Sequence, residues 1–487
     1  RRRSAVARGA ARAAGRAVAG GRPGSQQGEQ LFIREQLGIR KSSRAFLLEE
    51  QGQEWRHLAG QVEDARKKTV AMLLGYNGGR YKGLQQVAHP WKEGVDQFVP
   101  TVEAELEFAL MRAGGITPSN FGNIKKVNWT RVGRTDAGVS AVCNVVTARL
   151  MVEGGDEAGC RALVDRVNSF LPEDIVLHDA ALATKRFNAR SEGTRRSYLY
   201  LLPSYCVAPT LPRVAAALAA SGLEPRHLSP TAPRALETAA GLREVRVGPR
   251  ELGALRWALS CFEGTHFVGN FADVSLTDKD PQAFRNIRRA VCGEPFLDSG
   301  GREWLPIEIS ADSFVTHQIR KMLGTAALVA QGVLPKAYLH AALDRGVRCK
   351  TFRLPPFGLL FLRPHFSERE RGKTLGAALD DLMESGRTTA WSERLQRAIA
   401  EEDAESCHWV RWLACTTEFE AQLRRRATET VAQHARAKAQ HRARYAQRQA
   451  AAAQVAALIA VRGEPLWLGR HSWINRANRS RSSVSQP

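Results

Sequence analysis

The fold of this chain is constrained most by an alternation of strand-like and helix-like segments that begins at Thr69 and continues to about residue 366. The apolar run Val70–Tyr76 ends in the turn Asn77-Gly78-Gly79, which is typical of a buried strand. Thr101 is a suitable helix N-cap, and apolar residues follow it at helical spacing. Short connections between such segments favour layered helices and a mostly antiparallel sheet. The predicted fold class is therefore α+β, with two α/β halves that share one sheet.

The composition of the chain changes at both ends of this alternating region, which indicates extensions outside the core. A length of 487 residues predicts two or three domains. We assign an N-terminal extension, two core halves and a helical C-terminal extension, over residues 1–67, 68–200, 201–366 and 367–487. Further strands are predicted at 128–132, 142–150, 175–182, 197–202, 305–310 and 359–362, and further helices at 157–170, 251–262, 316–331, 336–345 and 418–460.

The formal net charge is +22, from 71 Lys and Arg against 49 Asp and Glu. Such a surplus predicts a polyanionic partner, an anionic membrane or a crowded basic surface. The chain contains no run of 18 apolar residues, which argues against a transmembrane helix. Neither end of the chain places Trp, Phe and Leu on one face of a basic helix, so a membrane-surface role is disfavoured.

The sequence predicts no cofactor and no metal. The eight cysteines are scattered without a Cys-x-x-Cys pair or a Cys/His cluster, which is typical of reduced thiols in an intracellular protein rather than of a zinc site. The glycines of the turn at 77–79 are not followed by Gly-Lys-Ser/Thr, so nucleotide cofactor binding is not expected there.

Both ends of the chain are basic. Residues 1–28 contain seven arginines and no acidic residue, which resembles an organelle transit peptide and predicts a mitochondrial location. The alternative is a disordered basic arm that binds RNA, with a nuclear location. Residues 421–487 contain 13 Lys and Arg against 2 Asp and Glu. This helical segment would lie on RNA or a ribonucleoprotein, or it would be a solvated tail; both interpretations stay open.

One polar loop lies between two predicted strands and contains an aspartate. It reads Gly133-Arg134-Thr135-Asp136-Ala137-Gly138-Val139-Ser140-Ala141. Loops on rigid scaffolds often contain reactive groups, and flanking glycines permit close approach by a ligand. From spacing alone, however, a single aspartate in a turn is more often a structural turn residue.

This loop resembles the Arg-Thr-Asp-x-Gly-Val-x-Ala signature of the TruA family of pseudouridine synthases. Six other segments are similar to family motifs in the same order, at 74–85, 101–110, 187–203, 262–266, 313–324 and 355–359. They include Gln318-Ile319-Arg320-Lys321-Met322, and their wording is most like the eukaryotic tRNA pseudouridine synthase branch. The resemblance covers 68–366 and implies a pseudouridine synthase fold with a central basic RNA-binding cleft. The chain departs from the family wording at Phe267–Phe271.

The resemblance implies that the protein isomerises uridine to pseudouridine in structured RNA. Asp136 would be the catalytic nucleophile, and Arg320 would contact its carboxylate and keep it ionised. Tyr198 would stack on the target uracil across the same cleft. Without the resemblance, a tyrosine in a strand is more often a core residue, and a helix-surface arginine is a plausible phosphate contact.

Basic residues near these motifs predict an RNA-binding surface, because Lys and Arg contact phosphate. Arg134 would also fill the space left by the extruded base. The predicted RNA-binding residues are Lys125, Lys126, Arg131, Arg134, Lys185, Arg186, Arg190, Arg195, Arg196 and Lys321. The expected partner is tRNA, with rRNA as another possibility. An alternative function is a ribosome-assembly factor that uses this fold as an RNA clamp, for example on mitochondrial rRNA, because a tRNA enzyme does not need long basic tails.

Overall fold

The structure is a computed structural model, and it describes residues 60, 62–86, 99–225, 228–229, 231–366, 379–381 and 383–462. The predicted transit peptide lies outside the described residues. None of the described helices is long and apolar enough to cross a membrane.

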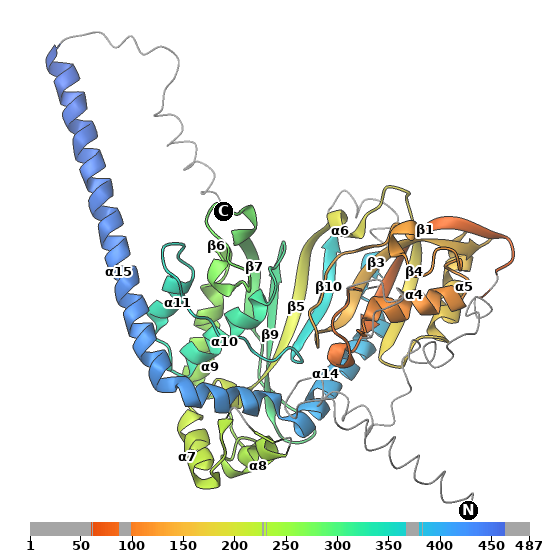
Figure 1. Ribbon diagram of the computed structural model, residues 1–487, viewed down its shortest axis with the longest axis horizontal. Helices are drawn as coiled ribbons and strands as arrows, with labels where there is room; N and C mark the ends of the chain where they lie inside the picture. The colour runs from red at the N-terminus through yellow and green to blue at the C-terminus, as the bar shows by residue number, and fades with distance from the viewer. Residues whose placement is uncertain are drawn as a thin grey trace, which may run out of the picture. The chain divides into compact units, whose positions relative to one another are not determined.

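A ten-stranded mixed sheet forms the centre of the protein, and it confirms the predicted mostly antiparallel arrangement (Figure 1). Its main strand order is β4-β1-β3-β10-β5-β9-β7-β6, with β2 paired to β3 and β8 paired to β9. The strands are β1 Ala65–Tyr76, β2 Thr130–Arg131, β3 Ser140–Glu153, β4 Ile175–Ala183, β5 Gly193–Pro203, β6 Gly264–Phe267, β7 Phe284–Cys292, β8 Phe296–Leu297, β9 Glu303–Ala311 and β10 Leu359–Phe366.

Strand β10 comes from the predicted second half, and it lies between β3 of the predicted first half and β5, which spans the predicted boundary at residue 200. Among the described strands, the β10–β3 pair is the parallel one, with Leu360 opposite Ser140, whereas β10 pairs with β5 in the antiparallel sense. The late strand β10 therefore places β3, which follows the Asp136 loop, and β5, which contains Tyr198, two positions apart in one sheet.

Strand β1 shows why the central strands could be recognised from the sequence. All residues from Thr69 to Tyr76 are buried, and both neighbours of β1 pair with it in the antiparallel sense. A strand that is covered on both faces reads as a continuous apolar run rather than as an alternating pattern. Strands β6 and β7 have exposed or half-exposed residues at most positions, and the sequence did not predict them.

The helices pack beside the sheet and against one another. Helix α4 begins as predicted, because the Thr101 side chain accepts a hydrogen bond from Ala104 N. Helices α6, α7 and α8 were not predicted, and α14 falls in the segment that was predicted only as a helical extension. The described helices are α4 Val102–Arg112, α5 Glu157–Asn168, α6 Ala189–Glu192, α7 Leu211–Ser221, α8 Ala232–Ala239, α9 Pro249–Ser260, α10 Gln318–Ala330, α11 Lys336–Ala342, α14 Gly386–Ser406 and α15 His408–Arg462.

The chain forms two compact units, Arg1–Thr430 and Val431–Pro487. Helix α14 and the beginning of α15 belong to the first unit, although the sequence placed them in an extension. Trp391 donates a hydrogen bond to Ala141 O at 3.3 Å, and the fully buried Trp409 donates one to Tyr200 Oη at 3.1 Å. These contacts make α14 and the start of α15 part of the core.

Candidate active site

The loop that contains Asp136 connects β2 to β3 and is tied to the core immediately before the aspartate. Tyr76 Oη and Thr135 Oγ1 share a hydrogen bond of 2.8 Å, and Asn144 Nδ2 donates to Gly133 O at 3.0 Å. Leu84 N donates to Thr135 O at 3.2 Å. The backbone that presents Asp136 is therefore held from β1, from β3 and from the segment after β1.

The segment after β1 packs so closely against the backbone of the Asp136 loop that two of its positions require glycine. Gly83 has a φ of +109°, and a Cβ atom there would lie 2.7 Å from Thr135 O. A Cβ atom at Gly78 would lie 2.1 Å from Val139 O. No side chain fits in either place without a backbone shift. The Gly-rich segment after β1 is thus a cradle for the Asp136 loop.

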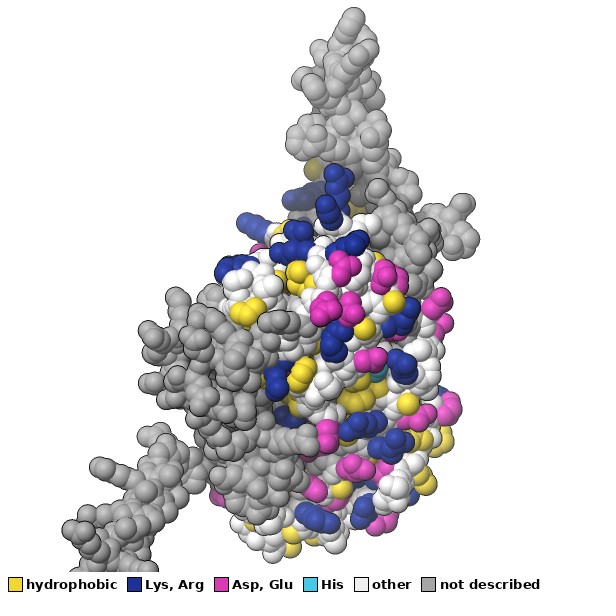
Figure 2. Space-filling model, turned by 90° about the vertical axis from the view of Figure 1, so that its right-hand side faces the viewer, with side chains coloured by type: hydrophobic (Ala, Val, Ile, Leu, Met, Phe, Trp, Pro, Cys, Tyr) yellow, Lys and Arg dark blue, Asp and Glu magenta, His cyan; other side chains and the backbone are white. Residues whose placement is uncertain are grey.

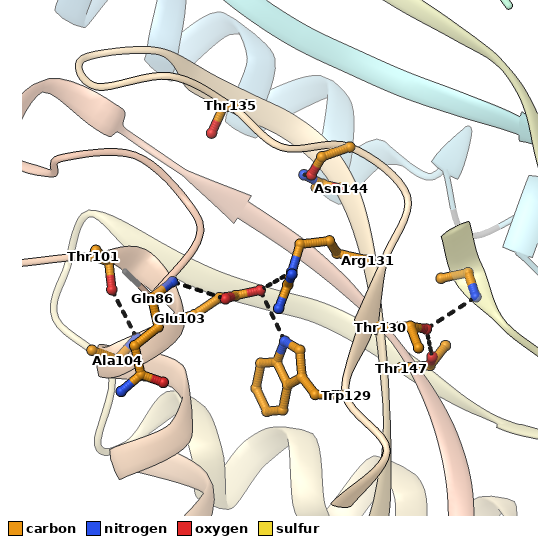
Figure 3. Close-up of polar contacts among 12 residues, drawn as sticks. Gln86, Thr101, Glu103, Ala104, Trp129, Thr130, Arg131, Thr135, Asn144 and Thr147 are labelled. Atoms are coloured by element: carbon orange, nitrogen blue, oxygen red, sulfur yellow. Dashed lines mark hydrogen bonds and ion pairs between the residues drawn. The ribbon is translucent and has the colours of Figure 1, made fainter. Parts of the chain in front are cut away.

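A buried carboxylate fixes the strand that leads into the loop (Figure 3). Glu103, at the start of α4, is fully buried and accepts hydrogen bonds from Trp129 Nε1 at 2.9 Å and from Gln86 N at 3.0 Å. It also forms an ion pair with Arg131. Burial raises the pKa of Glu103, and the positive charge of Arg131 opposes this change. Arg131, a predicted phosphate contact, is therefore engaged inside the protein.

The Asp136 side chain is about one-third exposed and lies beside a histidine. His317 Nε2 is 3.6 Å from Asp136 Oδ2. In the described part of the chain Asp136 forms no ion pair with Arg320, so the predicted direct contact is corrected. The Arg320 side chain is buried and donates instead from Nε to Leu354 O at 2.7 Å.

Arg320 is nevertheless an electrostatic neighbour of Asp136. Burial lowers the pKa of Arg320 to about 10, and the negative charge of Asp136 is among the effects that oppose this change. The guanidinium therefore stays protonated at neutral pH and contributes positive charge beside the aspartate.

Tyr198 lies on β5 and is buried between two aromatic rings. Its ring centroid is 5.0 Å from that of Phe361 and 5.4 Å from that of Phe314, both edge-on. Burial raises the pKa of the Tyr198 hydroxyl, and the nearby Asp136 charge raises it further. The hydroxyl thus stays protonated at neutral pH. The structure therefore brings Asp136, Arg320 and Tyr198 into one electrostatic neighbourhood.

The predicted RNA-binding residues divide into two groups. The exposed ones are Lys125, Lys126, Arg134, Lys185, Arg186 and Arg190, and of these Lys126 also donates from Nζ to Ser119 O at 2.7 Å. The others are engaged by protein groups: besides Arg131, the Arg196 guanidinium donates to four backbone carbonyls, and Lys321 Nζ forms an ion pair with Asp273. On the side of the molecule shown in Figure 2, basic and acidic side chains are interspersed among the described residues.

Arg195 faces the opposite side of the sheet from Tyr198, because side chains alternate along β5. It hydrogen-bonds His365 Nδ1 at 2.9 Å and lines a cavity of about 410 Å³ together with Ser197 and Arg363. A contact between Arg195 and RNA bound at Asp136 is therefore not expected.

Two functional candidates were missed by sequence reasoning. Neither His317 nor Asp273 was among the site residues that the sequence selected. His317 belongs to the same motif as Arg320, but the contact with Asp136 depends on long-range packing that no local pattern reveals.

Taken together, the candidate site consists of one carboxylate on a tethered loop, with a buried arginine and a buried tyrosine that its charge reaches. A family model described as tRNA pseudouridine synthase matches residues 258–367. A mouse protein called pseudouridylate synthase 1 homolog is 27% identical over 71% of this chain and 73% of its own length. The human homologue is 28% identical over 71% and 72%, and a Yarrowia lipolytica tRNA pseudouridine synthase 1 is 29% identical over 63% and 65%.

These similarities agree with the ordered motifs and with the mixed sheet. Over these lengths the chain is similar to tRNA pseudouridine synthases.

Proposed function

We propose that this protein isomerises uridine to pseudouridine in tRNA, with Asp136 as the nucleophile. The observation that carries the proposal is the position of Asp136 on a tethered loop, next to the charge of Arg320 and the hydroxyl of Tyr198. The similar proteins named as tRNA pseudouridine synthases support tRNA as the substrate class.

The reaction breaks the bond between uracil N1 and ribose C1′ and forms a bond between uracil C5 and C1′. A carboxylate can assist by covalent catalysis, through attack either at the ribose or at the uracil ring. Both routes use the carboxylate form of Asp136, and Arg320 contributes positive charge near it. A base that is stacked in a helix is out of reach, so we expect the target uridine to be extruded.

Tyr198 would contribute an aromatic surface and a protonated hydroxyl. Phe361 and Phe314 fix its ring from two sides, and stacking on the extruded uracil would then require little reorganisation. Arg134 and the other exposed basic residues would contact phosphate and position the RNA.

The test is to incubate the purified protein with uridine-labelled tRNA and to quantify pseudouridine. We expect the wild type to form it and Asp136→Ala to form none above background, because the nucleophile is absent. Asp136→Asn serves as the isosteric variant. Equal product from wild type and both variants would refute the enzymatic role of Asp136.

The assembly-factor alternative predicts stable association with ribosomal particles that persists in Asp136→Ala. Sedimentation of a gentle lysate, followed by immunodetection, separates the two functions. The acid-free Arg-rich segment at 1–28 supports a proposed mitochondrial location. Fusion of residues 1–67 to a fluorescent protein tests this: mitochondrial import supports the proposal, and a cytosolic or nuclear signal contradicts it.

A further inference from the structure

A histidine outside the predicted catalytic set is held between two aspartates. His317 immediately precedes α10 and has a left-handed backbone, with φ 61° and ψ 4°. Left-handed conformations are uncommon for residues other than glycine, and they persist where surrounding contacts maintain them. The His317 side chain makes no capping hydrogen bond to α10, so the start of the helix does not account for its orientation.

The contacts of the imidazole point toward Asp136. One ring nitrogen, Nε2, lies 3.6 Å from Asp136 Oδ2, and the other, Nδ1, hydrogen-bonds Asp273. The ring is four-fifths buried, so its orientation is set by the protein. It is a bridge between the proposed nucleophile and a second carboxylate.

Asp273 is itself fixed from two directions. Lys321 Nζ lies 2.6 Å from Asp273 Oδ1, and Arg353 Nη1 lies 3.2 Å from Asp273 Oδ2. Lys321 also donates to Ala272 O at 2.7 Å, which anchors the segment that carries Asp273. Partial burial raises the pKa of Asp273, but hydrogen bonds from Lys321 and His317 outweigh burial and leave the pKa below its usual value. Asp273 is therefore a fixed, ionised acceptor.

An ionised carboxylate only accepts hydrogen bonds, so His317 Nδ1 carries the proton that Asp273 accepts. Arg353 Nη1 is also 2.8 Å from Nδ1, but a ring nitrogen that donates its proton to Asp273 cannot accept a hydrogen bond from Arg353. The Arg353 guanidinium donates to the Asp273 carboxylate instead. The remaining nitrogen faces Asp136. The charged groups around the ring are Asp136, Asp273, Lys321, Arg353 and the neighbouring Arg320.

We propose that His317 is a positioning residue: Asp273 orients its imidazole, and the imidazole orients the Asp136 carboxylate toward the substrate. This inference rests on the proposed function, because it assigns His317 a role through Asp136. A protonated imidazole donates from both nitrogens, one to each aspartate, and a contact of 3.6 Å can shorten when the substrate excludes water. In this arrangement Arg320 contributes positive charge near Asp136, whereas His317 fixes the orientation of the Asp136 carboxylate.

The experiment measures single-turnover pseudouridine formation and tRNA affinity for the purified full-length protein. We expect His317→Ala to slow the chemical step by about tenfold to a hundredfold, because a nucleophile that is no longer aimed loses its effective concentration. The dissociation constant for tRNA should change by less than about twofold, since His317 acts on Asp136 and not on the RNA. Asp273→Asn should slow the same step less.

Three further measurements separate orientation from a merely structural role. His317→Gln should recover part of the rate, because its amide can donate a hydrogen bond to Asp136. Added imidazole should partly restore His317→Ala. His340→Ala, which changes an exposed histidine on α11, is the matched control and should leave rate and affinity unchanged. Melting temperatures verify folding, and His317→Gln is the fallback if His317→Ala does not fold.

The inference is overturned if His317→Ala and His317→Gln both react at the wild-type rate while Asp136→Ala is inactive. It is also overturned if the loss in folded His317→Ala appears only as weaker tRNA binding, or if neither glutamine nor imidazole recovers any rate. An Asp136→Ala protein with wild-type activity would instead refute the proposed function itself. The two failures are therefore distinguishable.

Discussion

At the scale of single residues, the position of Asp136 depends on a neighbouring glycine that has no side chain. Thr135 O accepts a hydrogen bond from Leu84 N, and Gly83 allows that contact because it has no Cβ atom. Tyr76 and Asn144 hold the loop from the other side. The aspartate is thus presented by a backbone that is constrained on both sides, as a nucleophile requires.

Gly83→Ala is expected to lower activity at least about tenfold and to destabilise the protein by about 1–2 kcal/mol, because its Cβ would displace Thr135 and its φ is unfavourable for alanine. Gly253→Ala is the control: it lies in α9 with no atom within 4 Å of the added methyl. There we expect unchanged activity and up to about 1 kcal/mol of stabilisation. Urea unfolding measures the stability of both variants, and single-turnover rates measure their activity. Equal stability and activity of the two variants would contradict the proposed role of Gly83 in supporting the Asp136 loop.

At the scale of elements, a buried ion-pair network joins α8 and α14 to the segment before β9. Arg302 Nη1 donates to Asp403 Oδ2 at 2.8 Å, and Arg302 also bonds Glu237 on α8. All three side chains are more than nine-tenths buried. Burial raises the pKa of Asp403 to about 6, and the Arg302 charge opposes this change. One guanidinium therefore connects α14 to α8.

Arg302→Met is expected to destabilise the protein by about 3–5 kcal/mol at neutral pH, because it leaves two buried carboxylates without their cation. A carboxyl group whose folded-state pKa is raised lowers stability as pH increases from its unfolded value toward the folded one. The loss in Arg302→Met should therefore be larger at pH 8 than at pH 5, where Asp403 is mostly protonated.

Urea unfolding at the two pH values measures this difference. Arg256→Met, which breaks the exposed ion pair with Glu294, is the control and should cost less than about 1 kcal/mol at either pH. A pH-independent loss in Arg302→Met would show that lost packing, rather than uncompensated charge, is responsible.

At the scale of the whole molecule, the catalytic core ends well beyond the last strand. Trp409 and Leu413 at the start of α15 are fully buried, and Trp409 lies edge-on to Trp304 with ring centroids 5.3 Å apart. Burial of such aromatic surface contributes several kcal/mol to a fold. The compact unit that extends to Thr430 therefore requires α14 and the first part of α15.

A chain that ends at Thr430 is expected to keep its melting temperature within about 3 °C, because the second compact unit begins at Val431. A chain that ends at Phe366 should be insoluble or should not unfold cooperatively, since Trp304 and Tyr200 would lose their cover. Circular dichroism melting measures both. A cooperative, unshifted transition for the shorter chain would show that α14 and α15 are dispensable.

The sequence by itself determined the central elements and nominated candidates for the reactive groups. Apolar runs such as Val70–Tyr76 and the capped helix after Thr101 have local periodicities that do not depend on distant residues. The motif resemblance likewise selected Asp136, Tyr198 and Arg320. These predictions rest on short-range patterns, and in the structure the charge of Asp136 acts on the pKa of both Tyr198 and Arg320.

The tertiary structure decided which of these groups touch. The insertion of β10 between β3 and β5, the docking of α14, and the contact of His317 with Asp136 all join segments far apart in the chain. Arg131 is a further example. The sequence predicts it as an RNA contact, but in the fold its guanidinium forms an ion pair with the buried Glu103. Contacts between distant segments depend on the order of strands in the sheet and on burial. Neither can be predicted from the spacing of residues that are close in sequence.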